Sequence, residues 1–295
     1  ALPIYSEEMN IDVEKTKAKV EELKKQGRLP KIAMFGGSVF LFPHPVKELA
    51  DFLKAHNMHI NYDAAHVAGL IAGGEFQDPL REGVDTMTMS THKTLFGPQG
   101  GLVLAFEKDA EAIKKATFPG LTSSHHIHHM AAKAVTFAEA LEFGKDYASQ
   151  TIKNAKALAV TLNDLGFKVL GEKKGFTQSH QTVVNVLDYG DGGKIEADLE
   201  KANIIVNRQL IPGDIKAKRH YMHPGGIRLG TSEVTRLGMK EPEMEQIASF
   251  IKSVIVDNKD TKDIAKQIAE FRKTYQKTQY CFDNKLGAYE YVKLR

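Results

Sequence analysis

The sequence has no tryptophan and only one cysteine, Cys281. A single thiol cannot form a disulfide within the chain, which excludes the small disulfide-stapled class of secreted proteins. The first ten residues, ALPIYSEEMN, show no secretory signal pattern. We therefore expect a reducing, cytoplasmic location.

The sequence also has little net charge and no long apolar run. The 40 Lys and Arg residues nearly balance the 37 Asp and Glu residues, and no basic block concentrates the net charge of +3. We therefore expect no nucleic-acid partner. No apolar run is long enough to cross a bilayer, so we expect no membrane association either. What is present, 42% hydrophobic and 26% charged residues over 295 positions, is typical of one large or two ordinary globular domains.

The first half of the chain alternates between strand and helix patterns. Apolar runs and alternating patterns predict strands, and amphipathic spacing predicts helices. This alternation favours an α/β fold with a largely parallel sheet. An alanine-rich helical pattern follows from 130 to about 165, as one long helix or two in tandem. The predicted strands are 31–37, 58–63, 84–90 and 101–107, and the predicted helices are 11–27 and 46–57.

After Gly166 the pattern changes to that of a small α+β domain. Strands are predicted at 182–190, 204–210 and 225–231, with helices at 195–203, 242–256 and 264–275. We therefore predict a large domain over 1–155 and a smaller C-terminal domain over 156–295.

Three polar residues follow three of the predicted strands. Ser38 follows the first, Asp63 the second and Lys93 the third. Alone, each has an ordinary explanation: a turn former, a helix cap and a solvated lysine. Because ligands of open α/β sheets bind outside the carboxyl ends of the strands, we expect the three side chains to converge on one crevice.

The combination of a lysine and a carboxylate suits pyridoxal-phosphate chemistry. A lysine that forms a Schiff base must be partly desolvated to lose its proton, and Lys93 is placed for this. A carboxylate such as Asp63 would keep the pyridine nitrogen protonated, so that the ring acts as an electron sink. His66 and His92 could reach the ring or transfer a proton. The segment GPQGG at 97–101 is predicted to turn the chain away from the lysine.

Several motifs resemble the serine hydroxymethyltransferase family, whose members are fold-type-I pyridoxal-phosphate enzymes. DAAHVAGLIA at 63–72 and THKTLFGPQGG at 91–101 are the most specific. Three further motifs also match, and all of the motifs stand in the same order as in the family. They are FGGSVF at 35–40, ATFPGL at 116–121 and GGIRLGTSEVTRLGM at 225–239. The resemblance implies part of a mostly parallel large domain, incomplete here, and a smaller C-terminal α+β domain.

The resemblance also assigns roles around the cofactor. Lys93 would carry pyridoxal 5'-phosphate, and Asp63 would pair with its pyridinium nitrogen. His66 and Ser38 would lie near the ring hydroxyl and the substrate carboxylate.

Three further residues receive catalytic or substrate roles from the same resemblance. Thr91 and His92 would flank the lysine, the threonine lying near the cofactor–substrate adduct. Arg228, in GGIRLGT, would hold the carboxylate of the amino acid. Arginine suits that role because its planar fork grips a carboxylate through two parallel hydrogen bonds.

The sequence TSSHHIHHM at 122–130 departs from the family, which has Gly-Gly-Pro-His there. In the family this loop reaches the cofactor phosphate of the neighbouring subunit, and Ser123 and Ser124 could supply hydroxyl and backbone donors for it. The four histidines between 125 and 129 lack a further ligand type at a convincing spacing. We therefore predict no metal site.

Other departures concern the rim of the site and the start of the chain. Gln99 stands where the family has arginine, and Phe40, Leu41 and Phe42 occupy a segment that is more polar in the family. Both changes bear on folate affinity. Family members also begin well upstream, with a segment that supplies phosphate-binding and proton-transfer groups. We therefore expect exposed sheet edges and no stable, active monomer from these residues alone.

The main functional hypothesis is a serine hydroxymethyltransferase of one-carbon metabolism. It would interconvert serine and glycine with a reduced folate or tetrahydromethanopterin, as a homodimer. A threonine or allothreonine aldolase is the alternative within the enzyme class, because retro-aldol cleavage needs the same lysine, acid and arginine but no folate. A truncated, non-catalytic relative that binds a partner subunit is the alternative outside it.

Overall fold

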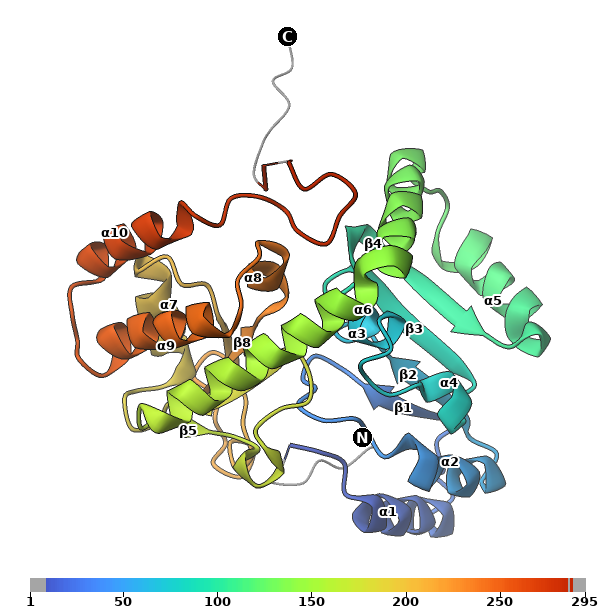
Figure 1. Cartoon of the computed structure of the whole chain (residues 1–295). Helices are drawn as coiled ribbons and strands as arrows, with labels where there is room; N and C mark the ends of the chain where they lie inside the picture. Colours follow the sequence, from blue (N-terminus) through green and yellow to red (C-terminus); the bar gives the residue numbers. More distant parts are fainter. Residues whose placement is uncertain (1–8, 286, 289–295) are drawn as a thin grey trace. The chain divides into compact units, whose positions relative to one another are not determined.

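The computed structural model describes residues 9–285 and 287–288. It divides into two compact units, Asn10–Lys145 and the residues from Asp146 onward. Each unit contains its own four-stranded sheet (Figure 1). The division falls ten residues before the boundary predicted after residue 155, inside one continuous helix. The assignment of functional domains to 1–155 and 156–295 stays a prediction.

The sheet of the first unit is mostly parallel. β1, β2 and β3 run parallel in that order, and β4 closes the sheet antiparallel to β3. This arrangement confirms the predicted α/β character of the large domain. The bounds of the strands are β1 (Ile32–Gly36), β2 (His59–Asp63), β3 (Thr86–His92) and β4 (Phe96–Ala105).

Helices connect these strands and bury their apolar faces. α2 packs beside β2, and its residues Val46, Leu49 and Leu53 are almost fully buried. Edge strand β1 alternates, so that Ala33 and Phe35 are buried while Ile32 and Met34 are largely exposed. The helices of this part are α1 (Val13–Lys25), α2 (Val46–Ala55), α3 (Ala68–Ala72) and α4 (Pro79–Glu82).

The turn predicted at 97–101 is wrong, because these residues lie inside β4. The chain reverses earlier, at 93–95. Ser90 pairs with Gly101, whereas His92 pairs with Phe96. Residues 97–100 of β4 therefore oppose the single residue Thr91 and form an irregular bulge of four residues.

Close packing explains why this bulge is rich in glycine. A Cβ atom on Gly97 would lie 2.7 Å from Oγ1 of Thr136, on the following long helix, and 2.8 Å from the backbone oxygen of Thr91. Neither contact is tolerable for a carbon atom. The glycines thus serve the approach of a helix to the strand rather than a reversal of the chain.

A long helix, α6 (Ile127–Asp164), follows the first sheet. It is continuous over 38 residues, which decides between the one helix and the two tandem helices that the sequence allowed. Shorter elements precede it: η1 (Glu107–Asp109), α5 (Ala110–Lys115) and η2 (Ala116–Leu121). No helix of the described residues is both long and apolar enough to span a membrane.

The second unit has the α+β architecture predicted for it. Its sheet is antiparallel, in the order β5 (Lys168–Val169), β6 (Gln181–Asn185), β8 (Gly226–Gly230) and β7 (Asn207–Gln209). β7 is only three residues long, shorter than the strand predicted over 204–210. The core contains the fully buried Leu162, Ile195, Leu199 and Met244. The helical elements are η3 (Glu172–Lys174), α7 (Gly192–Lys201), α8 (Ser232–Arg236), α9 (Glu241–Ile255) and α10 (Thr261–Arg272).

Candidate functional site

Lys93 lies immediately after β3, at the bend that leads into β4. Its Nζ atom is 3.2 Å from Nε2 of His66, which lies in the turn after β2. The sequence predicted that these two residues belong to one site, and the structure brings them into hydrogen-bonding distance. Both side chains are half-buried.

Thr94, which sequence reasoning missed, holds this bend in place. Its fully buried hydroxyl donates to the backbone oxygen of His66 at 2.8 Å and accepts from the backbone N–H of Gly69 at 3.0 Å. The two hydrogen bonds tie the lysine bend to the turn that carries the histidine. The only signal in the sequence was a threonine directly after the lysine.

Asp63 is the last residue of β2 and is half-buried. Its Oδ1 atom accepts a hydrogen bond from the N–H of Ala65 at 2.9 Å, which shapes the turn toward His66. In the sheet Asp63 lies between Gly36 of β1 and Thr88 of β3. The carboxylate therefore stands at the carboxyl edge of the parallel strands, where α/β proteins bind ligands.

Ser38 lies two residues beyond β1, at the same edge of the sheet, and its side chain is exposed. The structure thus places all three residues that follow predicted strands, Ser38, Asp63 and Lys93, at one edge. Their roles toward a cofactor stay predictions.

Thr91 and His92 contact the bulge in β4. The hydroxyl of the buried Thr91 donates to the backbone oxygen of Pro98 at 2.7 Å. Nδ1 of the exposed His92 accepts a longer hydrogen bond, 3.4 Å, from the N–H of Gly100. The two side chains point to opposite faces of β3, as successive residues of a strand do. Their catalytic roles stay predictions.

Ser123 and Ser124 are exposed and lie in the segment between η2 and α6. The neighbouring rings of His128 and His129 are 4.4 Å apart between centroids. Desolvation, followed by the nearby charges of His128 and other groups, lowers the pKa of His129. Among the residues that the structure describes, no group of three or more His, Cys, Asp or Glu side chains could hold a metal ion. The phosphate-binding role of the two serines stays a prediction.

Arg228 lies in the second unit, on the central strand β8. Its Nη2 atom donates to Oδ1 of Asn207 on β7 at 2.9 Å. Partial burial lowers the pKa of the Arg228 guanidinium, which nevertheless stays charged at neutral pH. Asn207, which sequence reasoning did not single out, fixes one edge of the guanidinium. The role of Arg228 toward a substrate carboxylate stays a prediction.

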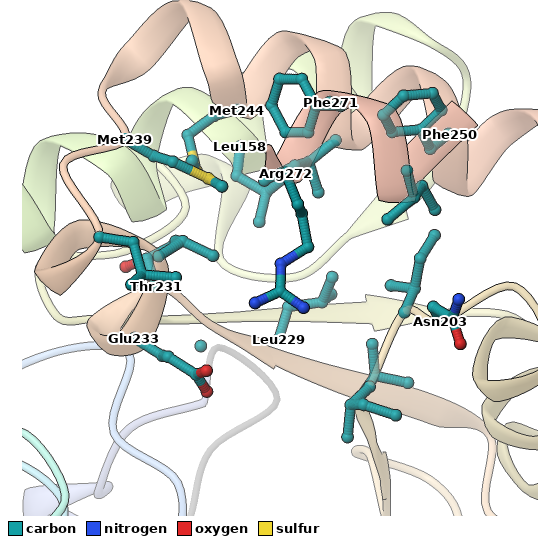
Figure 2. A pocket seen from close by; sticks show the side chains of 18 residues that line it. Leu158, Asn203, Leu229, Thr231, Glu233, Met239, Met244, Phe250, Phe271 and Arg272 are labelled. Carbon is teal, nitrogen blue, oxygen red and sulfur yellow. The ribbon is translucent and has the colours of Figure 1, made fainter. Parts of the chain in front are cut away.

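The second unit also contains a cavity of about 220 Å³. Figure 2 shows Arg272 projecting into it from α10, with Leu229 below and the α9 residue Phe250 at one side. Leu229 follows Arg228 on β8, so their side chains leave opposite faces of the strand. The cavity is therefore not the place where Arg228 would bind a substrate.

Comparison with known proteins places this geometry in a family. Residues 2–251 match the family model described as serine hydroxymethyltransferase. The chain is 77% identical over 293 residues to the serine hydroxymethyltransferase of Nitrosopumilus maritimus, covering 99% of this chain and 67% of that protein. It is 72% identical to that of Cenarchaeum symbiosum, again covering 99% of this chain and 66% of the relative. The chain thus spans about two thirds of the length of these relatives.

The fold is also similar to that of a solved structure. The L-threonine transaldolase of Pseudomonas fluorescens, in its internal aldimine state, superposes with a TM-score of 0.83. Its sequence is 32% identical, and the match covers 97% of this chain and 64% of that one.

Proposed function

Because the chain belongs to the serine hydroxymethyltransferase family, we propose that it carries the catalytic lysine of an enzyme that interconverts serine and glycine. The one-carbon unit would pass to a reduced folate or tetrahydromethanopterin. Family membership confirms the resemblance seen in the sequence and the fold-type-I architecture that it implied. The observation that carries the proposal is the Lys93 amine, 3.2 Å from His66 at the carboxyl edge of the parallel sheet.

Pyridoxal 5'-phosphate is the cofactor that both the family and the structural relative support. The residues at the sheet edge fit its aldehyde and pyridine groups: Lys93 offers an amine, and Asp63 offers a carboxylate at the end of the neighbouring strand. When bound, the cofactor supplies an electron sink for the bond that breaks. Ser123 and Ser124 are the residues that we propose for the phosphate of the cofactor in the neighbouring subunit.

The proposed roles follow from the chemistry of each side chain. The half-buried Lys93 must lose a proton to act as a nucleophile, and Nε2 of His66 is close enough to accept it. His92 and Thr91 flank the lysine, and Ser38 lies at the same edge as Asp63.

We further propose that Arg228 binds the substrate carboxylate. The hydrogen bond from Nη2 to Asn207 orients the guanidinium plane. A planar guanidinium can bind a carboxylate through two parallel hydrogen bonds.

A homodimer is the assembly that we propose. Large apolar side chains are exposed over 121–141, among them Leu121, Ile127 and Leu141, the last of these 90% exposed. Soluble proteins rarely leave contiguous apolar groups in water, and a second copy would cover them. Leu141→Glu is expected to shift the protein from dimer to monomer in sedimentation equilibrium, while Glu139→Gln on the same helix leaves the assembly unchanged. A dimer that survives Leu141→Glu would place the interface elsewhere.

A threonine or allothreonine aldolase activity is the second candidate. The likeness to L-threonine transaldolase favours it, as does Gln99 at a position where the family resemblance led us to expect arginine. Retro-aldol cleavage of a β-hydroxy amino acid needs the same lysine, acid and arginine, without a pterin.

The experiment that separates these functions measures glycine release from serine and from threonine, with and without a reduced folate or tetrahydromethanopterin. Faster turnover of serine that depends on the pterin supports the hydroxymethyltransferase. Pterin-independent turnover of threonine supports the aldolase. A protein that shows no visible absorption band of lysine-bound pyridoxal phosphate and turns over neither substrate would be the non-catalytic relative.

A further inference from the structure

A buried histidine, His44, lies in the segment between β1 and α2 and contacts the carboxyl end of β1, near the proposed site. Its side chain is only 3% exposed, and its ring stacks on that of Phe40 with 4.5 Å between centroids. The proposed reaction gives it no chemical role. A buried polar ring needs a hydrogen-bonding reason to be there.

One such reason is a hydrogen bond with the backbone at the end of β1. Nδ1 of His44 accepts a hydrogen bond from the backbone N–H of Gly36 at 3.2 Å. Gly36 is the last residue of β1 and pairs with Asp63 of β2. It has a φ of +92°, and a Cβ atom there would overlap the backbone carbonyl of Asp63. The backbone that His44 holds is therefore in direct contact with the backbone of Asp63.

A second set of hydrogen bonds connects His44 to the end of β2. The backbone N–H of His44 donates to Oε1 of Gln77 at 2.7 Å, and Nε2 of Gln77 donates back to the oxygen of His44 at 3.0 Å. The hydroxyl of Tyr62 donates to the same Oε1 at 2.7 Å. Tyr62 is fully buried and immediately precedes Asp63.

The protonation state of the imidazole is set by this arrangement. An acceptor at Nδ1 requires a neutral ring that carries its proton on Nε2. Burial lowers the pKa of His44 to about 4, which keeps the ring neutral near pH 7. A protonated ring would direct a second N–H at the N–H of Gly36, and the hydrogen bond would be lost.

We propose that His44 is a positioning residue, which fixes the ends of β1 and β2 through Gly36 and Gln77 so that Ser38 and Asp63 face the same cofactor. This inference rests on the proposed function, because it assigns the network to the binding of pyridoxal phosphate. It extends that function to residues that touch neither the cofactor nor the substrate.

The test compares two replacements of His44 in the cofactor-free protein. His44→Asn places an amide oxygen close to the position of Nδ1, whereas His44→Phe keeps an aromatic ring but has no acceptor. Leu53→Ala, at a buried position of α2, is the control for a loss of stability alone. Titration with pyridoxal phosphate gives the dissociation constant, and thermal unfolding gives the stability of each variant.

We expect His44→Phe to weaken pyridoxal-phosphate binding about tenfold, the equivalent of one lost hydrogen bond. His44→Asn should recover most of this loss. Leu53→Ala should bind the cofactor nearly as the native protein does, despite a lower midpoint of thermal unfolding. Amide hydrogen exchange at Gly36 should be faster in His44→Phe than in His44→Asn.

Two results would overturn the inference while leaving the proposed function intact. In the first, the native protein binds pyridoxal phosphate, and the His44→Phe variant binds it as tightly as Leu53→Ala does. The other is a His44→Asn variant no better than His44→Phe. A native protein that does not bind pyridoxal phosphate would instead remove the proposed function, and the inference with it.

Discussion

The Nζ atom of Lys93 and the Nε2 atom of His66 are 3.2 Å apart, although 27 residues separate them in the chain. Each residue follows a parallel strand, and β2 and β3 are neighbours in the sheet. Thr94 ties the two segments together through the backbone of His66. The pair is therefore a product of the sheet topology.

Lys93→Ala should reduce turnover by more than about a hundredfold, because it removes the amine that we propose as the nucleophile. The absorption band of the lysine-bound cofactor should also disappear. Because Lys93 is partly exposed, the free energy of unfolding should change by less than about 0.5 kcal/mol. Turnover and denaturant unfolding of the variant provide the measurement. Lys108→Ala, which removes an exposed lysine 3.5 Å from Asp85, is the control. Normal turnover in Lys93→Ala would refute the assignment.

Gly69→Ala should destabilise the protein by about 1–3 kcal/mol through overpacking. A Cβ atom on Gly69 would overlap the backbone carbonyl of Thr94 and lie 2.7 Å from the N–H nitrogen of Leu95. The bend that carries Lys93 would have to move, so cofactor affinity should fall as well. Gly101→Ala is the matched control, since its Cβ atom would meet only the oxygen of Met89, at 3.7 Å. Equal stability of the two variants, measured by urea unfolding, would contradict the packing argument.

Stability should depend on pH through His44. Its pKa is about 4 in the folded protein and about 6.5 when unfolded, so the unfolded state binds more protons between these values. The contribution of His44 is therefore fully present above pH 6.5 and is lost as the pH falls toward 4, by about 3 kcal/mol in all. Between pH 7.5 and 5.0, urea unfolding should show a decrease of about 2 kcal/mol in the native protein and a smaller one in His44→Asn. If the free energy of unfolding of the native protein and of His44→Asn decreased equally with pH, His44 would not be the group responsible.

Arg228→Lys should raise KM for serine at least tenfold, with a smaller effect on kcat. Lysine keeps the positive charge but cannot form the two parallel hydrogen bonds of the guanidinium. Asn207→Ala should raise KM less, because it removes only the hydrogen bond that orients the Nη2 edge. Steady-state kinetics on both variants provide the comparison, with Arg208→Lys on β7 as the control. A KM unchanged by Arg228→Lys would place carboxylate binding elsewhere.

The sequence predicted the parts of the fold and site that depend on local pattern. Short apolar or alternating runs identified β1, β2 and β3. Asp63 at the end of β2, and Ser38 and Lys93 just beyond β1 and β3, lie at the expected carboxyl ends of the strands. Once a strand is recognised in the sequence, the residues at its end are located as well. Parallel pairing then brings successive strand ends together, so these placements need no knowledge of tertiary contacts.

Other features depend on contacts between distant residues and could not be predicted in this way. The GPQGG segment contains ordinary turn residues, yet Gly97 is required by Thr136, 39 positions later in the chain. Asn207 supports Arg228 from the adjacent strand, and no local pattern marks it. His44 lies between two prolines in the sequence, with nothing to indicate a buried acceptor for Gly36.

The bulge in β4 also has a consequence for solubility. β4 is the last strand in the order of its sheet, so its outer backbone groups could template a strand from another molecule. Residues 97–100 interrupt the regular pairing and leave only Gly101 to Ala105 in continuous register. A foreign strand would meet a regular edge of five residues rather than one of the ten residues that β4 contains. The glycines that admit α6 thus also shorten the regular outer edge that β4 offers to a strand of another molecule.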